Sequence, residues 1–188
     1  ELEIDLLLTA VHRYYGYDFR DFEPGVVRRR IREGMLAGRV STISRFQDKL
    51  LRQRSIFKRF LRSFASANLR LFSDPGFYRA FRTKVVPQLK TYPFIRIWNA
   101  GCSTGEDVYS LAILLQEEGL YQRSRIYATD LSEDVVRQAR VGAFRLPVAE
   151  QCAADYQEAG GNRSLAEYFG KRGNRLFIEP SLKRNIVF

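Results

Sequence analysis

Small and acidic residues follow two apolar segments of the chain, where they could bind a nucleoside. The loop 101–105 reads Gly-Cys-Ser-Thr-Gly, comes after the apolar segment 95–99 and is followed by Glu106. A second apolar segment, 125–129, ends at Asp130. Glycines let a backbone approach a ligand closely, and an acid at the tip of the next strand accepts hydrogen bonds from ribose hydroxyl groups. This arrangement predicts a strand, loop, helix and second strand that together form a nucleoside site.

The loop differs from the common phosphate-binding motifs. It is not the G-x-G-x-x-G pattern of dinucleotide enzymes, and no Gly-Lys-Ser/Thr of a Walker loop follows it. Glu106 and Asp130, rather than a lysine, line the predicted site, which disfavours a phosphate ligand. A cationic nucleoside without phosphate, such as S-adenosylmethionine, suits it better. The alternative is that the glycines serve only the geometry of a tight turn between strand and helix.

The elements that must position this loop fall into two halves. Helical periodicity and N-cap signals predict helices throughout 1–90, one of them opened by Asp74 and a following proline. Pro87 should weaken the last turn of that helix. Strand and helix patterns alternate after residue 91, which is typical of an α/β domain with a parallel sheet. We therefore expect an all-helical domain at 1–90 and an α/β domain at 91–188.

The pattern becomes irregular after Gly142. Short helical pieces are followed by two β runs, 175–178 and 185–188, on either side of Pro180. These two runs are predicted to pair as a hairpin. The segment of about 142–188 is therefore expected to form a small β-subdomain.

The positive charge is concentrated in the first half. The 188 residues carry a net charge of +10. Residues 1–90 hold nineteen Lys and Arg against nine Asp and Glu, whereas residues 91–188 hold twelve of each kind. Part of the excess lies close together in one predicted helix, at Arg28, Arg29, Arg30 and Arg32.

This basic surface predicts an anionic partner, for which an acidic protein surface and nucleic acid both qualify. Aromatic residues of this half fall at core spacing rather than as exposed stacking platforms, which disfavours nucleic acid. The simpler interpretation is a solvated helix surface without a partner.

Other classes of site find little support. His12 is the single histidine, and Cys102 and Cys152 form no Cys-x-x-Cys pair, so we expect no metal site. No residue pairing identifies a catalytic nucleophile. No apolar run approaches the roughly 20 residues that cross a bilayer, and no secretory leader is visible. We expect a cytoplasmic protein without membrane insertion.

Three motifs carry a resemblance to a known family. The segment 96–112, Arg-Ile-Trp-Asn-Ala-Gly-Cys-Ser-Thr-Gly-Glu-Asp-Val-Tyr-Ser-Leu-Ala, resembles the cofactor-binding motif of chemotaxis receptor methyltransferases, the CheR family. Segments 128–132 and 139–142 resemble the next motif, and 74–78 resembles the linker helix between the family's two domains. The resemblance covers nearly the whole chain.

The resemblance implies a fold, an activity and a set of site residues. The fold is a small, basic, all-helical N-terminal domain followed by a Rossmann-like methyltransferase domain, here partial, with a small β-subdomain. The activity is methyl transfer from S-adenosylmethionine to glutamate side chains of chemoreceptors, leaving S-adenosylhomocysteine. Gly101 and Gly105 would back the cofactor, Glu106 would contact its polar end and Asp130 would hold the ribose. Asn68 falls where family members place an asparagine against the cofactor. The basic helix would meet the acidic helical surface of a chemoreceptor or signalling protein.

The chain departs from the family at two places. Arg70 stands at the position of a family threonine, and Ser73 at that of an active-site arginine. The family also continues beyond the point where this chain ends, so the strand near 95–99 is expected to present an open edge. Another chain or exchanged segments would cover that edge, as in a dimer. Two interpretations follow: a methyltransferase, or a docking module that binds a signalling partner without methyl transfer.

Overall fold

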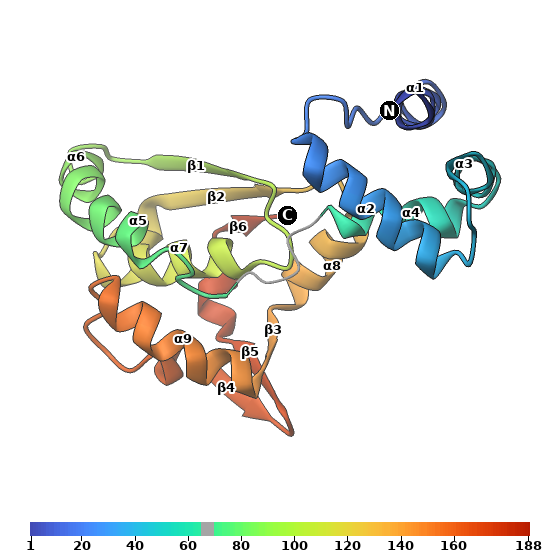
Figure 1. Ribbon diagram of the computed structural model, residues 1–188. Coiled ribbons are helices and arrows are strands. Elements are labelled where there is room, and N and C mark those ends of the chain that lie inside the picture. Colours follow the sequence, from blue (N-terminus) through green and yellow to red (C-terminus); the bar gives the residue numbers. More distant parts are fainter. Residues whose placement is uncertain (65–69) are drawn as a thin grey trace. The chain divides into compact units, whose positions relative to one another are not determined.

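The computed structural model describes residues 1–64 and 70–188, apart from the side chains of 146–151. The chain divides into two compact units, Glu1–Ala65 and Ser66–Phe188 (Figure 1). We expected the boundary near residue 90, but the helical segment 75–89 belongs to the second unit. Its side chains bond within that unit: the Tyr78 hydroxyl donates to the Asp107 carboxylate at 2.9 Å.

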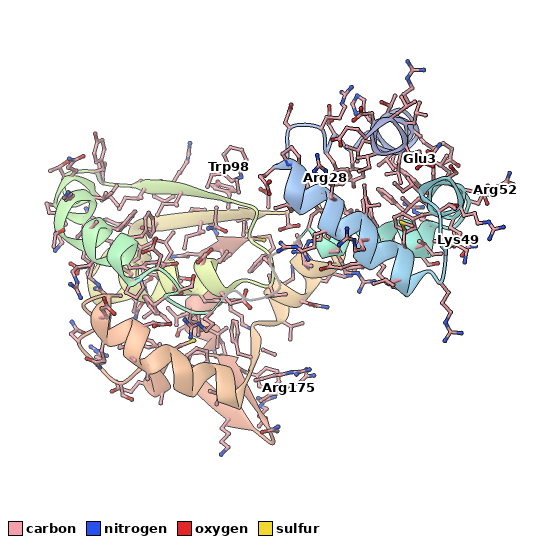
Figure 2. The ribbon with its side chains drawn as sticks, viewed as in Figure 1. Glu3, Arg28, Lys49, Arg52, Trp98 and Arg175 are labelled. Carbon is pink, nitrogen blue, oxygen red and sulfur yellow. The ribbon has the colours of Figure 1, made fainter. Side chains whose placement is uncertain are left out.

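The first unit is a set of packed helices. They are α1 (Leu2–Tyr15), α2 (Pro24–Ala37), α3 (Ile43–Arg52) and α4 (Arg54–Ser63). Their apolar faces bury a shared core that includes Leu7, Ile31 and Phe46. The charged side chains lie on the outside, as Figure 2 shows for Arg28 and Arg52. The predicted helical organisation of residues 1–64 is confirmed.

The second unit contains a parallel sheet, which positions the predicted loop. Its strands lie side by side in the order β1 (Ile95–Ala100), β2 (Ser124–Thr129) and β6 (Ile186–Val187) (Figure 1). All pair in parallel. Parallel strands end at the same edge of a sheet, so the residues that follow β1 and β2 are brought together there. The predicted Rossmann-like α/β arrangement is confirmed.

Strand β1 lies at one edge of this sheet. Trp98, Tyr127 and Val187 are register partners across the three strands, and all three are exposed, with Trp98 at 72%. The sheet therefore presents an apolar row on one face. The expectation that another chain or an exchanged segment covers the edge of β1 stays a prediction.

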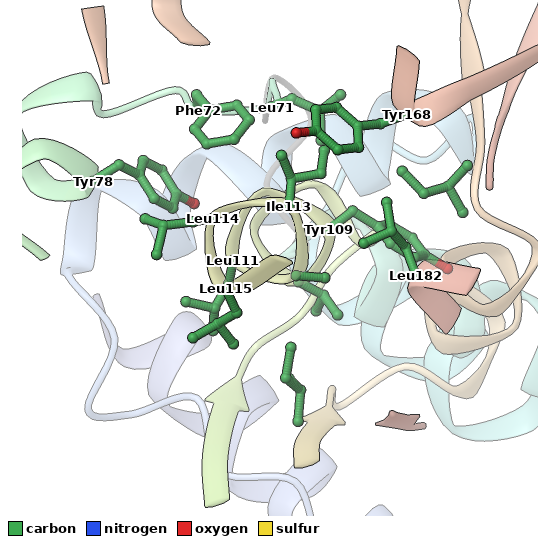
Figure 3. Close-up of a cluster of buried hydrophobic side chains, with 14 of the residues drawn as sticks. Leu71, Phe72, Tyr78, Tyr109, Leu111, Ile113, Leu114, Leu115, Tyr168 and Leu182 are labelled. Carbon is green, nitrogen blue, oxygen red and sulfur yellow. The ribbon is translucent and has the colours of Figure 1, made fainter. Parts of the chain in front are cut away.

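Helix α7 (Glu106–Glu117) forms the centre of the second unit's core. It buries residues on almost every side, among them Leu111, Ile113 and Leu115. Figure 3 looks along this helix and shows apolar side chains pointing outward from it in several directions. Such all-round burial holds the first turn of α7, and the loop before it, in a fixed position.

The segment 75–89 also packs in this unit. It consists of α5 (Pro75–Ala80), a π-helical segment (Phe81–Val85) and α6 (Val86–Leu89). Pro87 lacks an N–H, and its ring crowds the carbonyl four residues earlier, so a wider turn precedes it. The helix weakening predicted near Pro87 is therefore a π-helical turn before the proline.

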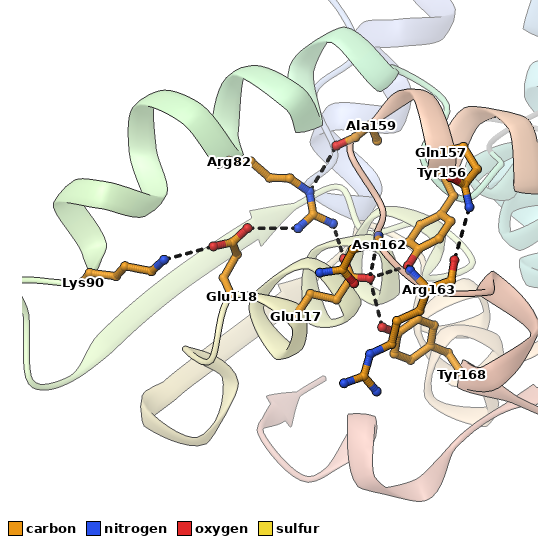
Figure 4. Close-up of polar contacts among 10 residues, drawn as sticks. All are labelled: Arg82, Lys90, Glu117, Glu118, Tyr156, Gln157, Ala159, Asn162, Arg163 and Tyr168. Atoms are coloured by element: carbon orange, nitrogen blue, oxygen red, sulfur yellow. Dashed lines mark hydrogen bonds and ion pairs between the residues drawn. The ribbon is translucent and has the colours of Figure 1, made fainter.

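A network of ion pairs and hydrogen bonds connects the segment 75–89 to α7 (Figure 4). Arg82 forms ion pairs with Glu117 and Glu118, the second at 3.1 Å. Hydroxyl groups of Tyr156 and Tyr168 donate to the Glu117 carboxylate, the second at 3.0 Å. The side chains of Arg82 and Glu117 are 9% and 1% exposed, so this is a buried, hydrogen-bonded ion pair.

A second, antiparallel sheet completes this unit. Its strands are β3 (Ala143–Arg145), β4 (Phe169–Arg172) and β5 (Arg175–Ile178), in the order β3-β5-β4. Helix α8 (Glu133–Val141) leads into it, and α9 (Leu146–Glu158) connects β3 to the rest. The predicted small β-subdomain is therefore present.

The predicted hairpin between 175–178 and 185–188 is wrong. Strand β5 pairs with β3 and β4, and β6 joins the parallel sheet beside β2. Pro180 opens a short 3₁₀ helix, Pro180–Lys183, which carries the chain from one sheet to the other. In the part of the chain that the structure describes, no helix is both long and apolar enough to cross a membrane.

Candidate functional site

The loop 101–105 is bonded to the end of the neighbouring strand. The backbone N–H groups of Gly101 and Cys102 both donate to the carbonyl of Thr129, at 2.8 Å each. The Gly105 N–H donates to the Cys102 carbonyl at 2.9 Å, which closes the turn before α7 begins. The loop therefore takes its shape from backbone hydrogen bonds at the carboxyl edge of the parallel sheet.

The two glycines of this loop have different roles. Both have positive φ, 75° at Gly101 and 100° at Gly105, where other residues are strained. A Cβ at Gly105 would lie 3.0 Å from a ring carbon of Tyr109 and 3.1 Å from Cβ of Ala139. A Cβ at Gly101 would meet no atom of the described residues within 4 Å. Gly105 is thus required by packing, whereas Gly101 borders open space where a ligand can approach the backbone.

Asp130 lies against the loop, as the sequence predicts. Its Oδ2 accepts a hydrogen bond from the Ser103 N–H at 2.9 Å, and its Oδ1 accepts one from the Ser132 N–H at 3.0 Å. The residue is partly exposed. A carboxylate has about four acceptor positions, so each oxygen retains capacity for a further donor. Asp130 can therefore hold the loop and also accept from hydroxyl groups of a ligand.

Glu106 is a buried acid without a cationic partner in the described part of the chain. It is 8% exposed, and the Thr104 hydroxyl lies 2.6 and 2.7 Å from its two carboxylate oxygens. Burial raises the pKa of Glu106 above its ordinary value, because desolvation disfavours the charged form. Its position at the start of α7 partly compensates the charge. A cationic group of a ligand would supply the missing compensation.

Two polar atoms near the loop were not anticipated from the sequence. Ser103 is 2% exposed, has a φ of 45°, and its hydroxyl has no hydrogen-bond partner among the residues that the structure describes. The carboxamide oxygen of Asn99, near the end of β1, is also buried and has no partner in the described part of the chain. Unpaired buried polar atoms are rare, so both are candidates for ligand contact. The signal available for Asn99 was a polar side chain close to the end of a strand that leads into the loop.

Cys102 is a packing residue of the loop. It is 1% exposed, and burial raises the pKa of its thiol to about 11. A thiol with that pKa stays protonated near neutral pH, which disfavours a nucleophilic role. Among the residues described, no group of three or more His, Cys, Asp or Glu could hold a metal ion.

Arg70 and Ser73 are the residues at which the chain departs from the family motif. Asn68 lies outside the described residues, so its predicted contact stays a prediction. The guanidinium of Arg70 lies 3.3 Å from the carboxylate of Asp155 on α9. Ser73 is exposed just before α5. Phe72 has a φ of 57°, and its N–H donates to the Ser110 hydroxyl of α7 at 2.9 Å. This segment is therefore attached to α7, and Ser73 brings no positive charge to it.

Comparison with known proteins identifies the family. Residues 69–188 match the family model described as CheR methyltransferase, SAM binding domain. A putative methyltransferase Cher3 of Pseudomonas putida is 37% identical over 188 residues, covering all of this chain and 69% of that protein. A chemotaxis protein methyltransferase of Listeria monocytogenes is 23% identical over 192 residues, covering all of this chain and 70% of that protein.

The residues of the loop fit S-adenosylmethionine, the ligand of this family model. The space beside Gly101, as the described residues leave it, has room for a ligand to approach the backbone. Asp130 retains acceptor capacity for ribose hydroxyl groups, and the buried Glu106 suits a positively charged group. Neither the loop nor its acids would suit a phosphate. This chain therefore belongs to the CheR methyltransferase family, and its cofactor is S-adenosylmethionine.

Proposed function

We propose that this protein methylates glutamate side chains of chemoreceptors or related signalling proteins. The observation that supports the cofactor half of this reaction is the buried Glu106 beside Asp130 and the open approach to Gly101. The glutamate substrate is supported by the relatives, which include chemotaxis protein methyltransferases.

Methyl transfer requires little of the protein beyond binding the cofactor and the substrate and aligning them. When bound, S-adenosylmethionine supplies an activated methyl group. An ionised glutamate of the substrate is already a nucleophile, so no general base is needed. The loop residues would bind and orient the cofactor, and the protein would exclude water around the substrate carboxylate.

The basic helix α2 is the proposed docking surface for the acidic helices of the substrate. Arg28 pairs with Glu1 at 2.8 Å, and Arg30 pairs with Glu33 at 2.9 Å. Arg29 and Arg32 are exposed and have no acidic partner among the described residues. They lie three positions apart, on one face of the helix. Of the four arginines predicted to dock, these two are therefore the best placed.

The exposed Ser73 favours a second candidate function. A docking module that binds a signalling partner without methyl transfer would have no use for the family arginine at this position. The guanidinium of Arg70, three positions earlier, pairs with Asp155 of α9.

The test pairs turnover with cofactor binding. The purified protein is incubated with labelled S-adenosylmethionine and a chemoreceptor cytoplasmic fragment, with a fragment whose methylated glutamates are changed to glutamine as control. Calorimetry measures S-adenosylhomocysteine binding. Binding with glutamate-dependent turnover supports the methyltransferase. Binding without turnover, rescued by Ser73→Arg, assigns the defect to that residue. Absence of both would contradict the proposal and support the docking module.

A further inference from the structure

The cofactor carries a negative charge for which the loop residues offer no partner. Its amino-acid end has an ammonium group and a carboxylate on the same carbon atom. Glu106 suits the ammonium group, and Asp130 retains acceptors for the ribose. The carboxylate needs donors, and hydrogen bonds from a cation are about twice as strong as those from a neutral group. Because the two charged groups share one carbon, such a cation must lie close to Glu106.

The segment that contains Arg70 is connected to Glu106 by hydrogen bonds. Leu71 and Phe72 are fully buried in the core around α7 (Figure 3). The Phe72 N–H donates to the Ser110 hydroxyl at 2.9 Å, and that hydroxyl donates to the Glu106 carbonyl at 2.8 Å. Two hydrogen bonds therefore hold this segment against the first turn of α7, where the ammonium group is expected to bind.

Helix α9 lies on another side of Arg70. The guanidinium is 3.3 Å from Oδ2 of Asp155, and Cys152 lies about one turn earlier on the same helix. Burial raises the pKa of the Cys152 thiol to about 11, and the charges of Arg70 and Glu106 shift it in opposite directions. Electrostatic effects weaken with distance, so both charged groups lie near the same sulfur atom.

The guanidinium of Arg70 retains donors for a further acid. Its side chain is 45% exposed, and its N–H groups form no hydrogen bond within the described part of the chain. Oδ2 of Asp155 is buried and likewise has no hydrogen bond among these residues. A guanidinium can bind a carboxylate through two parallel N–H groups while a second acid lies beside it. Asp155 can therefore orient Arg70 without using all of its donors.

We propose that Arg70 binds the carboxylate of the cofactor. Glu106 and Arg70 then bind the two charged groups of the amino-acid end from neighbouring positions, and Asp155 orients the guanidinium. The positive charge that the family resemblance places at position 73, where this chain has Ser73, is thus supplied from position 70. This inference goes beyond the proposed function, because it concerns the cofactor alone and holds whichever substrate receives the methyl group.

The test compares two ligands that differ only in this carboxylate. Calorimetry measures the affinity of the purified protein for S-adenosylhomocysteine and for its decarboxylated analogue, which keeps the ammonium group, the thioether and the adenosine. We expect the wild type to bind S-adenosylhomocysteine about tenfold or more tightly than the analogue. Equal affinities for the two ligands, or no binding of S-adenosylhomocysteine, would overturn the proposal.

Substitutions of Arg70 should weaken the binding of only one of the two ligands. Arg70→Gln should lower the affinity for S-adenosylhomocysteine about tenfold or more and should not weaken binding of the analogue. Unchanged binding of the analogue also shows that the variant is folded. Arg70→Lys keeps the charge but loses the paired N–H groups, so we expect a smaller loss of about three- to fivefold. Equal losses for both ligands in Arg70→Gln would assign Arg70 a structural role and contradict the proposal.

Arg79 provides a matched control in the same unit. Its guanidinium also reaches α9, where it donates to the carbonyl of Glu158 at 2.9 Å. Arg79→Gln therefore removes the same charge from another contact with that helix. The affinity for either ligand should change less than about twofold, because screening in water makes a distant surface charge weak. A loss in Arg79→Gln as large as that in Arg70→Gln would show that no specific contact with Arg70 exists.

Methyl transfer to a receptor fragment separates this inference from the proposed function. If the protein methylates the fragment and Arg70→Gln binds S-adenosylhomocysteine as the wild type does, the function stands and Arg70 does not bind the cofactor. If Arg70→Gln instead raises only KM for the fragment, Arg70 binds the substrate carboxylate and the proposal is wrong. If the two ligands are distinguished as expected but nothing is methylated, the function fails and the assignment of Arg70 stands.

Discussion

Helix α7 carries a buried glutamate at each end, and the two have opposite surroundings. Glu106 at its start is 8% exposed, and the side chain of Glu117 at its end is 1% exposed. Glu117 is met by the Arg82 guanidinium and by two tyrosine hydroxyl groups (Figure 4). Among the described groups, Glu106 has only the Thr104 hydroxyl and the start of the helix as partners.

The two sets of surroundings suit Glu117 to stabilising the fold and Glu106 to binding a ligand. A buried charge with a complete set of partners stabilises the arrangement that holds it, and burial near Glu117 raises the pKa of Tyr156 to about 12, so that tyrosine remains a donor. A buried charge without a cation lowers the stability of the fold unless a ligand supplies the counter-charge. We therefore expect the cationic part of the cofactor to bind beside Glu106.

The largest expected effect comes from removing the partner of Glu117. Arg82→Ala leaves that carboxylate buried and unpaired, so we expect the free energy of unfolding to fall by about 3–5 kcal/mol. Lys90→Ala is the control, because Lys90 pairs with Glu118 at 3.1 Å in an exposed position and should cost about 0–1 kcal/mol. Urea denaturation measures both. Equal losses in the two variants would show that Glu117 does not depend on Arg82.

Exchanging each glutamate for glutamine tests the comparison directly. Glu106→Gln removes the counter-charge for the cofactor, and we expect affinity for S-adenosylhomocysteine to fall by about 1.5–3 kcal/mol, the range for hydrogen bonds to charged groups. The same change should raise stability at neutral pH. Glu117→Gln should lower stability and leave the affinity within about twofold. Calorimetry and thermal unfolding of both variants give the answer, and a loss of affinity in Glu117→Gln alone would reverse our assignment.

The pH dependence of Glu106 has a defined sign. Its folded-state pKa is raised by burial, so its contribution to stability is fully present below the unfolded value near 4.5 and is lost as pH rises through the folded value. The affinity for the ligand has the opposite pH dependence, because the cation of the ligand needs the ionised carboxylate. We expect affinity for S-adenosylhomocysteine to fall about tenfold per pH unit below the raised pKa. Titrations from pH 8 to pH 4.5 should show this fall in the wild type and not in Glu106→Gln.

The smallest effect concerns the two open glycines before and after α7. Gly101 and Gly119 have φ values of 75° and 71°, and a Cβ at either would meet nothing within 4 Å. Alanine at each should cost a similar amount of stability, about 1–2 kcal/mol, from backbone strain alone. Only Gly101→Ala should also weaken cofactor binding, because only that glycine borders the proposed site. Similar affinities in the two variants would show that the open space at Gly101 is not used.

The cofactor loop could be predicted from the sequence because its parts are close in the chain. The glycines, Glu106 and Asp130 fall within one strand-loop-helix-strand unit, and parallel pairing of β1 with β2 brings them together. The partner of Glu117 could not be predicted, since Arg82 lies 35 residues away and reaches it only through the packing of 75–89 against α7.

Strand pairing was the other feature that the sequence did not reveal. Strand β5 has only four residues, and short apolar runs indicate a strand without indicating its neighbour. For example, Arg145, Arg175 and Arg172 are register partners across β3, β5 and β4, which becomes known only when both pairings are known. The positive φ of Ser103 is likewise a local feature that the sequence leaves open.

The wide π-helical turn at Phe81–Val85, which includes Arg82, sets the direction in which the residues after it project around the helix axis. In a regular α-helix, two residues eight positions apart differ by about 80° in direction around the axis. Tyr78 and Val86 are eight positions apart and are nonetheless both buried, at 3% and 1%. The wide turn holds more residues per revolution and brings the two onto one face. The number of residues in this turn, rather than the identity of their side chains, therefore places Tyr78 and Val86 on the same face. Deleting one of these residues would rotate Val86 or Tyr78 out of the core.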